Sequence, residues 1–163
     1  MKTAELADLV ELLSQEVDLL EKLHSVLVSQ QEALVEGDVE RISALVEEQI
    51  SVLNLVGEVE ARRKALLAAC GSDEGKPIKI DALIDIAPDY LATRLSSIRT
   101  ALREVIEAIG KVNSQNGMLI NQSLAYIDNT IKMIAGEDQT STVYTPNGEV
   151  TRNTGQIAID RTV

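Results

Sequence analysis

The N-terminal segment carries a heptad pattern over residues 4–35, which predicts one long amphipathic α-helix. Its apolar positions are separated alternately by four and three residues, so they line one side of the helix. The acidic residues of the segment fall off this side and are interpreted as a solvated face. The seam consists of Leu6, Val10, Leu13, Val17, Leu20, His24, Leu27, Gln31 and Leu34. Such a seam needs a partner helix to cover it.

A second helix is predicted over residues 39–70, separated from the first by Gly37 and Asp38. Glycine suits the left-handed end of a helix, and an aspartate carboxylate accepts hydrogen bonds from the free amides that begin the next one. Because the link is short and the two helices have similar lengths, we expect an antiparallel hairpin. The second helix has an apolar stripe of Ile42, Leu45, Val52, Val56, Val59, Leu66 and Cys70, widened by Leu53 and Leu67.

A loop, a short helix and a third long helix are predicted after the hairpin. Residues 71–77 contain two glycines, one proline and no apolar side chain, and are predicted to form a loop. The segment 78–88 is expected to begin extended and to become a short helix that is capped by Asp81 and ended by Pro88. Periodicity then predicts a third long helix over residues 89–135.

These patterns predict the all-α fold class: a long antiparallel helical hairpin packed with a third long helix, as a coiled-coil-like three-helix bundle. Residues 1–136 would form this bundle domain. Residues 137–163 contain six threonines, a Pro146-Asn147-Gly148 turn signal and no helical period. We therefore expect a disordered and flexible C-terminal tail.

The last part of the third helix, residues 109–136, combines an apolar stripe with polar side chains and two glycines. Asn116 falls on this stripe within a run of four-residue steps from Val112 to Leu124, a stutter that changes the geometry offered to a partner helix. Each glycine costs about 1 kcal/mol relative to alanine, which indicates a close backbone approach or a weak point. The stripe is either a working surface or part of the bundle core.

The composition argues against several classes of partner. A net charge of -11 repels phosphate backbones and anionic headgroups, so we expect no nucleic-acid partner and no membrane insertion. The chain has three tyrosines and no Phe or Trp, which leaves few rings on which a base or a flat cofactor could stack. The N-terminus has no apolar signal-peptide region, and Cys70 is the single cysteine. We therefore expect a cytoplasmic protein without a cofactor.

No catalytic constellation emerges from the sequence, and we expect a protein that is not an enzyme. Glu21 and His24 have the Glu-x-x-His spacing of di-iron helical bundles, but those sites need the motif twice. His24 is the only histidine, so no metal site is expected. Cys70 has no histidine nearby in sequence that could activate its thiol.

Several stretches in both halves of the chain carry a family pattern. The run V-N-S-Q-N-G-M-L-I from Val112 to Ile120 is followed by a helical leucine repeat and then by Thr142-Val143-Tyr144 with Gly148. The N-terminal half contains D-L-L-E-K-L-H and E-A-L-V-E-G-D-V-E-R-I. Together these stretches resemble the flagellar type III export chaperones of the FlgN family, and the resemblance spans nearly the whole chain.

The resemblance implies a cytosolic chaperone, without enzymatic activity or ATP, that binds hook-associated proteins of the hook-filament junction and prevents their premature assembly. The implied partners are the terminal amphipathic helices of these proteins and the cytosolic domain of the export gate. Tyr144 would be the residue that docks on the gate domain. The formation of a weak homo-oligomer is also compatible with the sequence. The cargo-binding residues predicted on the third helix are Ile109, Val112, Asn113, Asn116, Leu119, Ile120, Leu124, Ile127 and Ile131.

Two other classes remain compatible with the sequence. A structural or adaptor coiled-coil protein would use every heptad without any export cargo. A small helical mutase would have to bind its dianionic substrate through clustered arginines, although salt bridges to nearby carboxylates explain them more simply. The arginines concerned are Arg62, Arg63, Arg94, Arg99 and Arg103.

Overall fold

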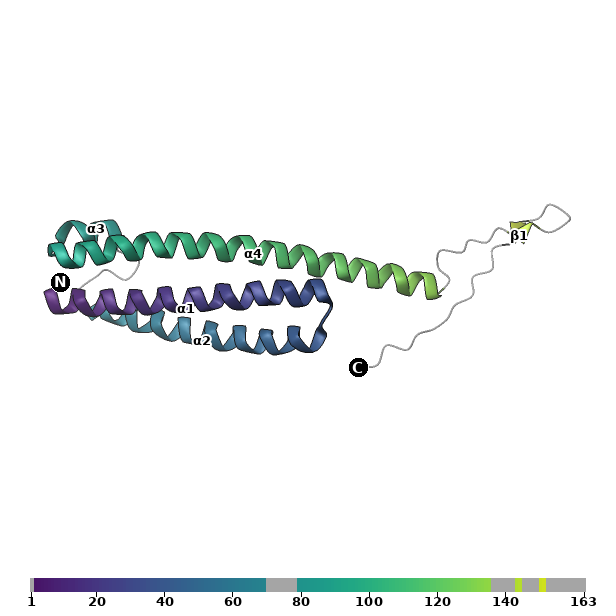
Figure 1. Ribbon diagram of the computed structural model, residues 1–163, viewed down its shortest axis with the longest axis horizontal. Helices are drawn as coiled ribbons and strands as arrows, with labels where there is room; N and C mark the ends of the chain where they lie inside the picture. Colours follow the sequence, from purple (N-terminus) through teal and green to yellow (C-terminus); the bar gives the residue numbers. More distant parts are fainter. Residues whose placement is uncertain (1, 70–78, 136–142, 145–149, 152–163) are drawn as a thin grey trace. The chain divides into compact units, whose positions relative to one another are not determined.

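A computed structural model describes residues 2–69, 79–135, 143–144 and 150–151 (Figure 1). These residues form the helices α1 (Thr3–Glu36), α2 (Val39–Ala69), α3 (Ile80–Ile86) and α4 (Asp89–Ala135), and the strands β1 (Val143–Tyr144) and β2 (Val150–Thr151). The predicted all-α class is confirmed, and α1, α2 and α4 agree with the three predicted long helices within one residue at each described end. Of the described helices, none has the length and apolarity that a membrane span requires.

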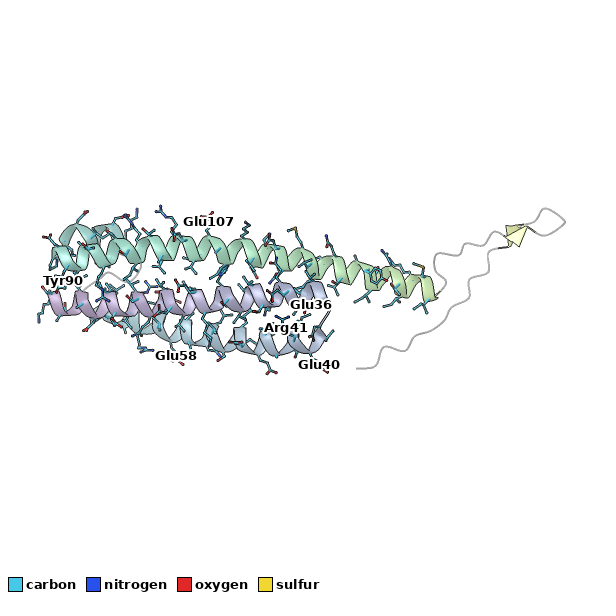
Figure 2. The ribbon with its side chains drawn as sticks, in the orientation of Figure 1. Glu36, Glu40, Arg41, Glu58, Tyr90 and Glu107 are labelled. Carbon is cyan, nitrogen blue, oxygen red and sulfur yellow. The ribbon has the colours of Figure 1, made fainter. Side chains whose placement is uncertain are left out.

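The turn between α1 and α2 has the chemistry that the sequence predicts. Gly37 ends α1 with φ 70° and ψ 24°, a left-handed conformation that glycine adopts without steric conflict. The Asp38 carboxylate accepts a hydrogen bond at 3.0 Å from the backbone N–H of Arg41 and so caps α2. The Arg41 guanidinium donates to Glu32 at 2.9 Å and to Glu36 at 3.0 Å (Figure 2). The Glu32 hydrogen bond is the main cause of a raised pKa for Arg41.

The structure divides into two units, Met1–Leu119 and Ile120–Val163, and the first of them contains two clusters of buried apolar side chains. One cluster joins the N-terminal half of α1 to α3 and to the beginning of α4. It consists of Leu6, Leu9, Val10, Leu13, Val17, Leu83, Leu91, Leu95 and Ile98. The other joins Leu23 and Leu27 of α1 to Val52 of α2 and Val112 of α4. Within this unit α1 and α4 therefore run parallel, and α2 is antiparallel to both. The predicted domain division after residue 136 stays a prediction.

Two adjacent glutamines show that α1 is covered on two sides. Gln30 donates from Nε2 to Oε1 of Gln49 in α2 at 2.8 Å, and Gln31 donates from Nε2 to Oε1 of Gln115 in α4 at 3.1 Å. In the second half of α1 the buried side of the helix is therefore wider than the single predicted seam. The buried positions there are Leu23, Val26, Leu27, Gln30 and Ala33, whereas the predicted Leu20, His24, Gln31 and Leu34 are half-buried.

The predicted short helix is present as α3, but its predicted cap is wrong. The helix begins after Lys79, whose side chain makes no capping hydrogen bond, and Asp81 lies inside the first turn. The Asp81 carboxylate instead forms an ion pair with the guanidinium of Arg99 in α4. Pro88 separates α3 from α4, as predicted. The loop predicted over residues 71–77 lies outside the described residues.

Four residues of the predicted tail form an antiparallel strand pair that the sequence analysis did not predict. Val143 lies opposite Thr151, and Tyr144 lies opposite Val150. The predicted turn at residues 146–148 falls between the two strands and lies outside the described residues, as does most of the segment for which disorder was predicted.

Candidate functional site

The apolar stripe of α4 is buried in its first part and exposed in its second. The buried residues of α4 are Leu91, Leu95, Ile98, Val105, Val112 and Asn116. After Asn116 no residue of this helix is buried, although the structure describes all of them through Ala135. The change falls within the run of four-residue steps between Val112 and Leu124. The stutter thus separates two heptad registers, one that contains the buried residues of α4 and one whose residues are exposed.

We name the exposed continuation of the stripe the distal stripe, which consists of Ile120, Leu124, Ile127, Ile131 and Ile134. Their spacings of four, three, four and three residues place them within an arc of about 80° on the helix surface. Their exposed fractions lie between 45% and 77%. A row of large apolar side chains with this exposure is typical of a surface that another helix covers.

The polar side of the same segment has its own contacts. Lys132 Nζ lies 2.8 Å from Asp128 Oδ2, a spacing of one helical turn. The Thr130 hydroxyl donates to the carbonyl of Tyr126 at 2.9 Å. This segment is therefore an amphipathic helix, with the aliphatic distal stripe on one side and the polar contacts of Asp128 and Lys132 away from it.

Three of the nine predicted cargo-binding residues belong to the bundle core. Val112 belongs to the cluster that contains Leu27, and Ile109 packs against that cluster. Asn116 is 5% exposed, and its Nδ2 donates to the carbonyl oxygen of Leu27 at 2.9 Å. This hydrogen bond joins α4 to α1, so the Asn116 side chain contributes to packing within the chain.

The other six predicted residues lie at the surface or at its edge. Asn113 is exposed and Leu119 is half-buried. Ile120, Leu124, Ile127 and Ile131 belong to the distal stripe, which also includes Ile134, a residue that the site prediction left out. The structure therefore does not bring all nine residues together on one surface.

We expect Asn116→Ala to lower the free energy of unfolding by about 1 kcal/mol, because it removes a buried hydrogen bond between two helices. Asn113→Ala is the matched control, since Asn113 is exposed on the same helix. That control should stabilise the protein slightly, because alanine exceeds asparagine in helix propensity by about 0.6 kcal/mol. Urea unfolding followed by circular dichroism measures both variants. Equal effects of the two substitutions would mean that the bond to Leu27 contributes nothing.

The two glycines of α4 lie in open space. Apart from the backbone of its own helix and its chain neighbours, no heavy atom lies within 4 Å of the position that a Cβ would take at Gly110 or Gly117. The described part of the chain therefore gives no support for a close backbone approach at either position. Gly117 instead lowers helix stability by about 1 kcal/mol directly beside the last buried residue of the stripe.

Three of the five arginines considered for an enzyme are paired with carboxylates. Arg63 Nε lies 3.2 Å from Glu16 Oε2, and Arg94 Nη2 lies 3.5 Å from Glu11 Oε2, while Arg99 pairs with a carboxylate of α3. A shallow hollow between α1 and α2 is lined by Gln15, Asp18, Leu19, Leu55, Val59 and Arg62. Among the residues that the structure describes, no three potential metal ligands lie close enough to hold an ion. This arrangement favours the salt-bridge explanation of the arginines.

Comparison with known protein families gives one finding. The family model described as FlgN protein matches residues 1–152. The matched range contains α1 to α4 and both strands, and it includes the distal stripe and Tyr144. Comparisons with curated proteins and with solved structures give no match.

Proposed function

The chain belongs to the FlgN family of flagellar export chaperones, and we propose that it binds hook-associated proteins in the cytoplasm and delivers them to the export gate. The observation that carries this proposal is the distal stripe, a row of exposed aliphatic side chains on α4. A chaperone for a protein that assembles through amphipathic helices must offer those helices a substitute apolar partner until export.

The spacing of the distal stripe fits an amphipathic helix as cargo. Steps of four, three, four and three residues are those of a coiled-coil seam, whose side chains insert between the side chains of a facing helix. The terminal helices of hook-associated proteins would bury their own apolar faces on this seam. Premature pairing of one cargo molecule with another would then be blocked.

The proposed cargo surface keeps only part of the predicted set. Ile120, Leu124, Ile127 and Ile131 stay in it, and Ile134 joins them. Asn113 and Leu119 lie at its margin. Ile109, Val112 and Asn116 leave it, because their contacts with the bundle core cover them.

Co-purification tests the proposed function. The tagged full-length chain is recovered from a flagellated cell, and the captured proteins are identified by mass spectrometry. We expect hook-associated proteins among them, reduced in a parallel capture with the Leu124→Asp variant. Capture of no hook-associated protein, with the bait folded and abundant, would favour a structural or adaptor coiled-coil protein without export cargo.

Gate docking is proposed to be separate from cargo binding and to depend on Tyr144 in β1. A tyrosine buries a large ring at little entropic cost and keeps a hydroxyl for a hydrogen bond. We expect Tyr144→Ala to weaken binding to the cytosolic gate domain roughly tenfold and to leave cargo affinity unchanged. Tyr90→Ala is the matched control, because Tyr90 is an exposed tyrosine in the first turn of α4. Calorimetric titration of both partners decides the matter: equal loss of the two affinities, or no loss of either, contradicts a separate docking segment.

A further inference from the structure

Helix α2 carries a second apolar seam on the side that does not pack in the bundle. We name it the outer seam, and it consists of Val39, Ser43, Val46, Ile50, Leu53 and Gly57. The steps alternate between four and three residues, which is the spacing of a coiled-coil interface. The buried residues of α2, Val52 and Val59, lie on the opposite side of the helix.

The outer seam is exposed and uncharged over its whole length. Val39, Val46, Ile50 and Leu53 have exposed fractions between 41% and 75%. Glu40 and Glu58, which flank it, also lie on the surface of α2 (Figure 2). Single exposed aliphatic side chains are ordinary, but four of them on one heptad row, interrupted by Ser43, indicate a helix that lacks its partner.

We infer that the outer seam pairs with the outer seam of a second copy of this chain, with the two α2 helices antiparallel about a two-fold axis. In the central register Ile50 of one copy lies opposite Leu53 of the other. Val46 then lies opposite Gly57, where no heavy atom lies within 4 Å of the position that a Cβ would take. In this register the Val46 side chain of each copy faces a residue that has no side chain.

The charges of α2 favour the antiparallel arrangement over the parallel one. Antiparallel pairing sets Glu47 beside Asn54 of the other copy and Lys64 beside Glu40, so the facing seam positions bring no like charges together. Parallel pairing would instead place Lys64 against Lys64 and Gly57 against Gly57, which combines repulsion with a void. Lys64 already bonds Glu60 on its own helix at 2.7 Å, a contact that orients its ammonium toward the edge of the seam.

The pairing surface is one helix long, so the dimer interface is small. The fraction of chains in the dimer should therefore rise with protein concentration. Sedimentation velocity of the full-length chain, from low micromolar to near-millimolar concentration, should show a monomer giving way to a dimer. Ile50→Asp should weaken association roughly 100-fold or more, because the two-fold axis places two carboxylates in one apolar interface. Ser51→Asp adds the same charge one residue away at an exposed position outside the seam, and it should leave association unchanged.

Circular dichroism is measured first, to establish that both variants stay folded before their association is compared. A chain that stays monomeric at every concentration overturns the inference. So does a dimer that Ile50→Asp leaves intact, or one that Ser51→Asp weakens as strongly. Binding of cargo to the outer seam of a monomeric chain would assign this surface to another partner and would also overturn it.

Disulfide trapping tests the orientation. Val39→Cys and Lys64→Cys are placed in separate chains, each with Cys70→Ser so that no other thiol competes. Antiparallel pairing predicts a disulfide-linked dimer when the two variants are mixed and little cross-linking of either variant alone. Cross-linking of each variant to itself, without the mixed product, would show a parallel pair and contradict the proposed register.

Discussion

Replacing Leu95 with alanine is expected to lower the free energy of unfolding by about 3 kcal/mol. Leu95 has an exposed fraction of 0% and packs in the cluster that joins α1, α3 and α4. Truncation removes buried methyl groups and leaves a cavity, because the three surrounding helices can relax only partly to fill it. Denaturant unfolding of the purified protein, followed by circular dichroism, measures the change.

Leu124→Ala is the matched control, because it makes the same chemical change on the same stripe of the same helix. Leu124 is 58% exposed, so we expect its truncation to change the free energy of unfolding by less than about 0.5 kcal/mol. The pair of variants tests the division of the stripe into a core part and a free part. A loss at Leu124 as large as the loss at Leu95 would mean that the distal stripe is covered within the free protein.

Replacing Leu124 or Ile127 with aspartate is expected to weaken cargo binding roughly 100-fold. Each substitution would place an unpaired carboxylate in the apolar interface that the cargo helix forms with the distal stripe, and burial of such a charge is costly. Both positions are exposed in the free protein, so the helical spectrum and the unfolding midpoint should be preserved. Calorimetric titration with a purified hook-associated protein gives the affinities.

Asn129→Asp controls for charge in this series. Asn129 is exposed, and helical geometry places it on the side of α4 opposite the distal stripe. The expected result is unchanged affinity for this variant beside a large loss for Leu124→Asp. An equal loss in both variants would reduce the effect to general electrostatic repulsion, and retained affinity in both would remove the distal stripe from the cargo site.

The boundaries of the long helices could be predicted because local chemistry determines them. Gly37 supplies the left-handed residue that ends α1, and Asp38 supplies the acceptor that begins α2. Pro88 separates two helices without help from distant contacts. The failed prediction at Asp81 has the opposite cause, because its carboxylate pairs with Arg99 from another helix, and local sequence gives no sign of that contact.

The division of the α4 stripe could not be predicted from periodicity. A heptad row indicates which side of a helix is apolar, but not what covers it, so Val112 and Leu124 have the same pattern and different environments. The stutter between them was a local signal for the change. The outer seam of α2 was not predicted, although its four-three spacing is visible in the sequence. The other apolar stripe of this helix was already sufficient to explain its packing in the bundle.

The most direct test of the proposed cargo site is hydrogen-deuterium exchange of the full-length chain, measured alone and with a saturating hook-associated protein. Amides exchange through local opening of a helix, and a bound partner helix suppresses that opening. The proposal predicts that cargo slows exchange chiefly over residues 120–135 and leaves the buried part of α4 near Leu95 unchanged. Cargo-dependent protection confined to α1, α2 or the first part of α4, with none over residues 120–135, would contradict it.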